Sequence, residues 1–234
     1  MFAVVQFPGS NDDRDVRFAM KAVVGADAEL VWHKQSELPA QTAAVLLPGG
    51  FSYGDYLRAG AMAQYSPVMA AVRRFAEAGG PVLGVCNGFQ VLCESGLLPG
   101  ALLRNRQLQF VCEFVHVRVE RAAAPFLSRA AVGQVLRLPI KHGEGAFFAG
   151  PELLERLERN GQIALRYCGP DGAVSDAANP NGSLRNAAGV CNERGNVLGL
   201  MPHPEHAVEA AIGGSDGLVL LGSLADAVRA VGPR

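Results

Sequence analysis

A cysteine lies between two glycines in the segment Gly84-Val85-Cys86-Asn87-Gly88. The residues before it, Pro81–Val85, are apolar and predict a strand, and a helical pattern begins directly after the cysteine. Glycines on both sides permit the tight strand-to-helix turn that lifts a nucleophile out of the carboxyl edge of a sheet. N–H groups at the start of the helix favour the thiolate, the reactive form of cysteine. An isolated cysteine is as often a core residue, so a nucleophile requires a base elsewhere in the chain.

A candidate base lies near the other end of the chain, in Leu200-Met201-Pro202-His203-Pro204-Glu205, after the apolar run Val197–Leu200 that predicts another buried strand. The prolines bias the residues before them toward extended geometry, so His203 follows the strand in a stiff segment. Glu205 is two residues further on and can lean to the same side. Its carboxylate can hold one imidazole nitrogen as N–H and leave the other to take a thiol proton. We therefore predict Cys86, His203 and Glu205 as nucleophile, base and orienting carboxylate.

An oxyanion hole is predicted from Pro48-Gly49-Gly50-Phe51, which follows the apolar strand Val45–Leu47. Consecutive glycines let main-chain N–H groups face a ligand without interference from a Cβ atom. Gly50 and Asn87, the residue after the cysteine, would supply the two donors, and Gly49 would contact the substrate. A phosphate-binding loop is disfavoured, because no Gly-Lys-Ser/Thr follows and the G-x-G-x-x-G spacing is missing.

These segments, in this order, resemble class I glutamine amidotransferases, and longer strings narrow the resemblance to the glutaminase subunits of phosphoribosylformylglycinamidine synthases. The strings are Val4–Asn11, Pro48–Gly60, Leu98–Asn105, Pro139–Gly145, Asn179–Ser183 and Gly195–Glu205. The resemblance covers residues 2–230, and His206 is a small departure from it.

The resemblance implies a flavodoxin-like α/β fold, an open and mostly parallel sheet with helices on both faces, in a single domain over residues 2–232. It implies hydrolysis of L-glutamine to glutamate and ammonia, with the ammonia passed to a separate large synthetase subunit. That subunit would use ATP and magnesium to make formylglycinamidine ribonucleotide in purine biosynthesis, with a small third subunit in the complex and no cofactor in this chain. Gln90 would bind glutamine, with helix capping as the alternative. Arg58, His142 and Glu144 lie in loops that would contact the synthetase.

Two other functions are compatible with the same residues or must be weighed against them. A γ-glutamyl hydrolase or a cysteine peptidase on the same scaffold would have the same elbow and triad. A non-catalytic binding module is disfavoured because cysteine, histidine and glutamate are all present.

Composition restricts the class of protein. The 234 residues carry a net charge of −1 with scattered Lys and Arg, so nothing indicates nucleic-acid binding. Five cysteines without paired C-x-x-C spacing argue against a metal site or a disulfide framework. No apolar run approaches the roughly 18 residues of a membrane span, so we expect a reduced, cytoplasmic setting and no membrane contact. No linker divides the chain, which favours one domain.

Apolar strands alternating with amphipathic helices predict a parallel sheet covered on both faces. We predict strands at 2–7, 28–33, 43–47, 81–85, 162–168, 184–191 and 197–200, and helices at 12–26, 62–78, 87–95, 151–159 and 216–231. The alternating runs 107–121 and 132–140 predict a small antiparallel insertion beside that core. The remaining cysteines, Cys93, Cys112, Cys168 and Cys191, are expected to be inert core residues, and His33 and His116 to be structural.

Overall fold

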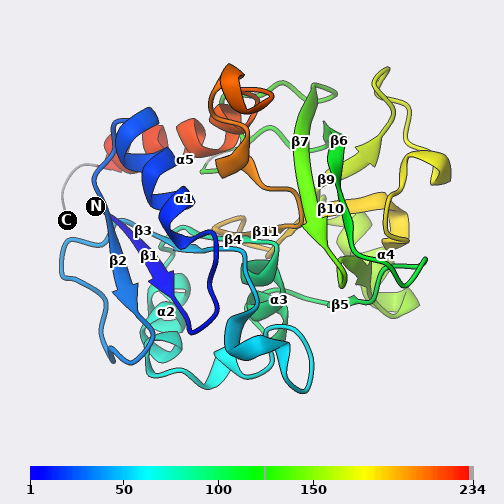
Figure 1. Ribbon diagram of the computed structural model, residues 1–234. Helices are drawn as coiled ribbons and strands as arrows, with labels where there is room; N and C mark the ends of the chain where they lie inside the picture. The colour runs from blue at the N-terminus through cyan, green and yellow to red at the C-terminus, as the bar shows by residue number, and fades with distance from the viewer. Residues whose placement is uncertain (124, 232–234) are drawn as a thin grey trace.

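The computed structural model describes residues 1–123 and 125–231 and is built around a nine-stranded sheet with the order β2-β1-β3-β4-β11-β10-β9-β6-β7 (Figure 1). The predicted end of the domain, residue 232, lies outside the described residues. Because β4 and β11 are neighbours, the strand before Cys86 lies beside the strand before His203. The strands are, in chain order, β1 (Phe2–Gln6), β2 (Ala28–Trp32), β3 (Ala44–Leu47), β4 (Val82–Val85), β6 (Val111–Val119), β7 (Val135–His142), β9 (Ile163–Cys168), β10 (Ala187–Cys191) and β11 (Val197–Leu200).

The strands β2, β1, β3, β4 and β11 form the parallel half of the sheet. All except β2 are almost entirely buried, as expected for parallel strands covered on both faces. The helices α1 (Asp13–Phe18) and α5 (Gly217–Val231) lie on one side of them, and α2 (Pro67–Glu77) and α3 (Asn87–Glu94) lie on the other (Figure 1). The predicted α/β fold is confirmed.

The strands β10, β9, β6 and β7 form an antiparallel half that continues the same sheet. The sequence predicted a small insertion beside the core, whereas β10 is hydrogen-bonded to β11 and the other three strands follow it outward. Alternation in β6, where Val115, Val117 and Val119 are buried, identifies a half-covered strand but does not indicate which edge it joins. The antiparallel region is therefore part of the sheet that positions the site.

A second, two-stranded sheet was not predicted from the sequence. It joins β5 (Ala101–Leu103) to β8 (Ala146–Phe148), just before α4 (Pro151–Arg159). Phe147 in β8 is buried and stacks on Phe89 of α3 with ring centroids 6.1 Å apart. This contact holds the segment before β8 close to the helix that follows Cys86.

Several predicted elements are shorter than expected. The first helix passes into a π-helical turn, η1 (Ala19–Val23), and ends there, before residue 26. The second begins only at Pro67, because the residues before it form a separate 3-10 turn, η3 (Ala63–Tyr65). The predicted strand at 184–191 begins at Ala187, after the 3-10 turn η5 (Leu184–Asn186).

The expectation that Cys112 is a core residue is wrong, because its side chain is exposed. The alternation of β6 places Cys112 on the face opposite to its buried valines. Cys168 and Cys191 are buried as expected, and Cys93 is half-buried with a thiol whose pKa is raised by burial. His33 is also buried, whereas His116 is partly exposed.

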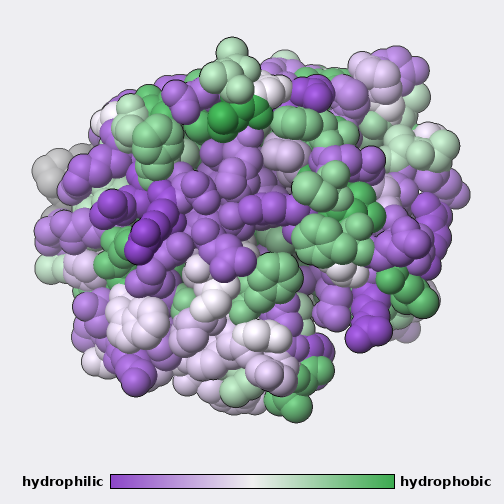
Figure 2. Space-filling model, viewed as in Figure 1, coloured by the Kyte–Doolittle hydropathy of each residue, from purple (hydrophilic) through white to green (hydrophobic). Residues whose placement is uncertain are grey.

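Hydrophilic residues cover much of the surface seen in Figure 2, and a hydrophobic cluster lies over β6 and β7. Large apolar side chains are also exposed just after β3, namely Phe51, Tyr56 and Leu57. Within the described ranges, no helix combines the length and the apolar character needed to cross a membrane.

Candidate active site

Cys86 occupies a strained turn between β4 and α3. Its φ is +50° and its ψ is −106°, in a region that non-glycine residues rarely occupy. Such strain costs on the order of 1–3 kcal/mol and is concentrated at functional sites. The flanking glycines are sterically required, since an added Cβ would lie 2.6 Å from the Gly88 carbonyl oxygen at Gly84 and 2.0 Å from the Leu47 carbonyl oxygen at Gly88. The turn therefore has the geometry of a nucleophile elbow.

His203 and Glu205 form a buried pair after β11. Both side chains are inaccessible, and Nδ1 of His203 lies 2.6 Å from Oε1 of Glu205. An Nδ1–H group that donates to the carboxylate leaves Nε2 as the second functional nitrogen. Nε2 is buried, and the described residues provide no hydrogen-bond acceptor or donor for it within normal distance. The pair thus has the arrangement of a base and its orienting carboxylate.

The charges around His203 favour its protonated form. Burial lowers the pKa of His203, but the Glu205 carboxylate and the Cys86 sulfur outweigh that effect and raise the pKa to about 10. The imidazole is therefore an imidazolium at neutral pH. A positive charge beside the sulfur stabilises a thiolate.

A cavity of about 230 Å³ opens beside Cys86. This volume is below the roughly 300–1,000 Å³ of sites for drug-sized ligands and suits a single amino acid. The predicted site residues among those that line it are Gly50, Cys86, Gln90, His142 and Glu144. Its wall also includes Asn11, Asp12, Phe51, Asp55, Phe110, Lys141 and Gly143.

Gly50 and Gly49 are both required to be glycine, for different reasons. Gly50 has a φ of +144° and pairs with Ser10, and a Cβ there would lie 2.6 Å from the backbone nitrogen of Asn11. A Cβ on Gly49 would lie 2.3 Å from Asp12 Oδ2 and 2.7 Å from His203 Cε1. Gly50 lines the cavity and Gly49 does not. Gly49 therefore makes room for the side chains of Asp12 and His203. Because Gly49 does not line the cavity, the cavity gives no support to its predicted contact with the substrate.

The side chain of Asn87 connects the elbow to the loop after β3. Its Oδ1 accepts a hydrogen bond from the Ser52 N–H at 3.1 Å, and its Nδ2 lies 3.2 Å from Asp55 Oδ1 and 2.8 Å from Gln90 Oε1. Gln90 in turn donates to the Glu144 carbonyl oxygen at 2.5 Å. Because Gln90 lies inside α3 and reaches another loop, the helix-capping alternative for this residue is wrong.

The residues predicted to contact a partner differ in accessibility. Arg58 is exposed and makes a bidentate pair with Glu94, with both N–O distances at 2.6 Å. Glu144 is half-buried at the cavity and lies 3.6 Å from Arg104. His142 is only 3% exposed, and its Nδ1 lies 3.0 Å from Asn105 Oδ1. His142 is therefore a cavity residue, and its burial does not fit the predicted contact with a partner.

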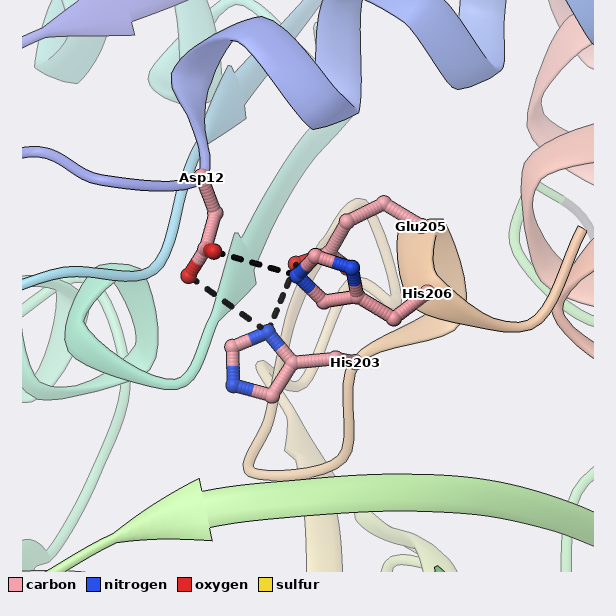
Figure 3. A group of neighbouring side chains, drawn as sticks. All are labelled: Asp12, His203, Glu205 and His206. Carbon is pink, nitrogen blue, oxygen red and sulfur yellow. Dashed lines mark hydrogen bonds and ion pairs between the residues drawn. The ribbon is translucent and has the colours of Figure 1, made fainter. Parts of the chain in front are cut away.

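Sequence reasoning did not identify three charged residues of the cavity, Asp12, Asp55 and Lys141. Asp55 follows residues with positive φ at Tyr53 and Gly54, and burial together with the Glu144 charge raises the pKa of its carboxyl to about 6. Asp12 begins the predicted helix at 12–26, but its side chain makes no capping hydrogen bond. Its carboxylate pairs with Lys141 and also with His206, the second contact being drawn in Figure 3. Lys141 directly follows the predicted extended run at 132–140, and its position at the end of that run was the available signal.

Asp12, His203, Glu205 and His206 place ligand-type atoms within 4.8 Å of one another, so these four residues resemble a metal-binding group. The Lys141 ammonium group already pairs with Asp12 in this cluster, and its positive charge opposes a second cation. The prediction that this chain has no metal site stays a prediction.

Comparison with known proteins agrees with this geometry. Residues 1–213 match the model of the CobB/CobQ-like glutamine amidotransferase domain. The chain belongs to this glutamine amidotransferase family. A relative from Thermomicrobium roseum, named phosphoribosylformylglycinamidine synthase subunit PurQ, is 57% identical over 95% of this amidotransferase chain and 94% of its own length. A relative of the same name from Gloeobacter violaceus is 56% identical over 98% of this chain and 99% of its own length.

A solved structure has the same fold as this amidotransferase. The structure of PurLQS from Thermotoga maritima contains a chain that is 41% identical and superimposes with a TM-score of 0.85. The match covers 96% of the amidotransferase described here and 97% of the chain in that structure. The resemblance inferred from the sequence is confirmed.

Proposed function

We propose that this chain is the glutaminase subunit of a phosphoribosylformylglycinamidine synthase and hydrolyses L-glutamine to glutamate and ammonia. The observation that carries the proposal is the buried His203–Glu205 pair beside a strained cysteine, at a cavity of amino-acid size. The amidotransferase family and the subunit name of its relatives support the choice of substrate.

The proposed reaction begins with the Cys86 thiolate and the His203 imidazolium. The sulfur attacks the side-chain amide carbon of glutamine, and the N–H groups of Gly50 and Asn87 stabilise the oxyanion. The carbon–nitrogen bond breaks as His203 gives its proton to the leaving nitrogen, so that ammonia departs and a γ-glutamyl thioester remains. His203 then takes a proton from water, the hydroxyl attacks the thioester, and glutamate leaves as the Cys86–His203 pair is restored. Glu205 holds the imidazole in the required tautomer throughout.

Gln90 is the proposed contact for the polar groups of glutamine. Its amide lines the cavity and is already oriented by Asn87 and by the Glu144 carbonyl oxygen. Such prior orientation reduces the entropy lost when a ligand is bound.

The ammonia is proposed to pass to a large synthetase subunit, which would bind ATP and magnesium and make formylglycinamidine ribonucleotide. Ammonia in water is largely protonated and then a poor nucleophile, which favours release inside a complex. The name of the PurLQS structure from Thermotoga maritima supports two partner subunits, which we propose to be the large synthetase and a small third subunit. We further propose a single amidotransferase domain over residues 2–232, no cofactor in this chain, and a cytoplasmic location.

The test is to copurify the chain with the synthetase and the third subunit, and to measure glutamate and amidine formation with glutamine or ammonium as nitrogen source. Glutamine-dependent amidine formation supports the proposal. Cleavage of peptides or folate polyglutamate tails without glutamine hydrolysis would instead identify the cysteine peptidase or the γ-glutamyl hydrolase.

A further inference from the structure

Asp12 is a buried carboxylate that the proposed reaction does not use. It lies at the N-terminal cap of α1, but its side chain makes no capping hydrogen bond, and the residue is only 2% exposed. A carboxylate removed from water is stable only when it is paired. Its partners therefore indicate what it does.

One oxygen of Asp12 is held by two neighbouring side chains. Oδ1 accepts hydrogen bonds from Lys141 Nζ and from His206 Nε2, the second over 3.1 Å. Lys141 also contacts the nucleophile, since the sulfur of Cys86 lies 3.7 Å from its carbonyl oxygen. Asp12 is thus fixed between β7 and the 3-10 turn η6 (Pro204–His206), at the wall of the cavity.

The other oxygen of Asp12 faces the base. Oδ2 lies 3.7 Å from His203 Nδ1, the same nitrogen that lies 2.6 Å from Glu205 Oε1 (Figure 3). The glycine at position 49 keeps the space around Asp12 Oδ2 and the imidazole free of any side chain. Two carboxylates therefore share one edge of the imidazole ring.

The charges that face His203 come from the cap of α1, the elbow, β7 and η6. They are negative at Asp12 and Glu205, positive at Lys141, and titratable at Cys86, His142 and His206. Burial and the positive charge of His203 lower the pKa of His142 to about 4, so this side chain is neutral near pH 7. Burial raises the pKa of Asp12, but His206, His203 and Lys141 together hold it well below its usual range. Asp12 therefore keeps its negative charge at all working pH values.

We propose that Asp12 is a positioning residue for the base: with Glu205 it stabilises the imidazolium form of His203, while Lys141 and His206 hold it in place. This inference rests on the proposed function of His203 as the base. An opposite charge within about 4–6 Å shifts a titration by roughly 1–3 pH units. Lys141 offsets part of the Asp12 charge, so the contribution of Asp12 is about one pH unit.

The test follows the titration of the His203 imidazole by nuclear magnetic resonance in the full chain, labelled with ¹⁵N at histidine. Asp12→Asn keeps the shape and removes the charge, so the titration moves to lower pH by about one unit. Lys141→Gln removes the cation that offsets Asp12, so the titration moves to higher pH. Glu158→Gln, which breaks a distant ion pair with Arg166 at 2.6 Å, is the matched control and leaves the titration unchanged.

A shift of the His203 titration to lower pH in Asp12→Asn and to higher pH in Lys141→Gln supports the inference. A purely structural role of Asp12 would not move the titration in opposite directions in the two variants. An unchanged His203 titration in Asp12→Asn overturns it. If Asp12→Asn does not fold, Lys141→Gln decides alone, and an unchanged or lowered titration overturns the inference.

Activity distinguishes this inference from the proposed function. In the complex with the synthetase, the alkaline limb of glutamate release should move in the same directions as the imidazole titration. A wild-type complex that releases no glutamate from glutamine contradicts the proposed function. If the wild-type complex is active and the alkaline limb of the Asp12→Asn complex lies at the same pH as that of the wild type, only the role of Asp12 is contradicted.

Discussion

The two halves of the sheet contribute to the site in different ways. The parallel half contributes through strand ends: Gly50 follows β3, Cys86 follows β4 and His203 follows β11. The antiparallel half contributes through its last strand, β7, which ends at Lys141 and His142. Although β7 is the edge of the sheet farthest from the parallel strands, Pro139 in β7 accepts a hydrogen bond from the His203 N–H at 2.8 Å.

This difference shows which parts of a site can be found from local sequence. Carboxyl ends of parallel strands meet at one edge, so residues just after such strands come together in any fold of this type. A strand at the far edge reaches the same place only through tertiary contacts, such as those of Pro139 with His203 and of Lys141 with Cys86, and nothing local to β7 specifies them. The predictions below test whether the parallel half carries the chemistry and the antiparallel half adjusts it.

The largest effect is expected for Cys86→Ala. Glutamine-dependent amidine formation by the complex should fall to background, and ammonia-dependent formation should remain, because the two half-reactions have separate sites. A glutamine analogue with an electrophilic γ-position should label Cys86 alone, as read by peptide mass spectrometry. Labelling of the exposed Cys112 in place of Cys86 would contradict the assignment.

His203→Ala should lower glutaminase turnover by roughly 10⁴- to 10⁶-fold, as expected when the base of a triad is removed. His206→Ala should lower it only a few-fold, because His206 acts through Asp12. Steady-state glutamate release by the complex measures both. A larger loss in His206→Ala than in His203→Ala would reverse the roles of the two histidines.

Gly50→Ala should lower turnover by roughly 100- to 1,000-fold, the effect of losing one oxyanion donor. The added Cβ would meet the backbone of Asn11 and would not tolerate a φ of +144°, so the N–H group must move. Gly150→Ala is the control, since that glycine has no heavy atom within 4 Å of the added Cβ. Equal turnover in both variants would show that the Gly50 N–H is not a donor.

Stability should depend on pH through His203. Its pKa is raised from the ordinary 6.5 to about 10 in the folded chain. The stabilisation is therefore complete below the unfolded value and is lost as the pH rises through about 10. The urea midpoint of the chain should fall from neutral pH toward pH 10, and Glu205→Gln should flatten that dependence. A midpoint that rises over this interval would contradict the imidazolium assignment.

The smallest effect is expected in the loops predicted to contact the synthetase. Arg58→Ala should reduce activation by the synthetase a few-fold and leave the basal turnover of the free chain unchanged, because Arg58 lies outside the cavity. Arg74→Ala, which breaks another exposed ion pair with Glu37, is the control and should leave activation intact. The ratio of turnover with and without the synthetase measures the effect, and a basal loss in Arg58→Ala would place the residue in the site instead.

The sequence was sufficient to predict the α/β fold, the strand ends of the parallel half and the His203–Glu205 contact, because glycines and prolines specify local backbone geometry. It was not sufficient for Asp12, which looks like an ordinary helix cap until Lys141 and His206 are placed beside it. The β5–β8 sheet also depends on tertiary contacts, since a three-residue strand has no detectable period. The prediction that Cys112 is a core residue was wrong because the sequence of a strand does not indicate which of its two faces is covered.

The side chain of Asn87 has a consequence for how the site tolerates change. It accepts from a backbone N–H and donates toward two other side chains, so both its oxygen and its nitrogen are in use. An aspartate in its place would have the same shape but no donor, and would set a second carboxylate against Asp55, which is 3.2 Å from the Asn87 nitrogen. At this position the chain depends on the polarity of a single atom: exchanging one nitrogen for oxygen would keep the bond from the Ser52 N–H and remove those to Asp55 and Gln90.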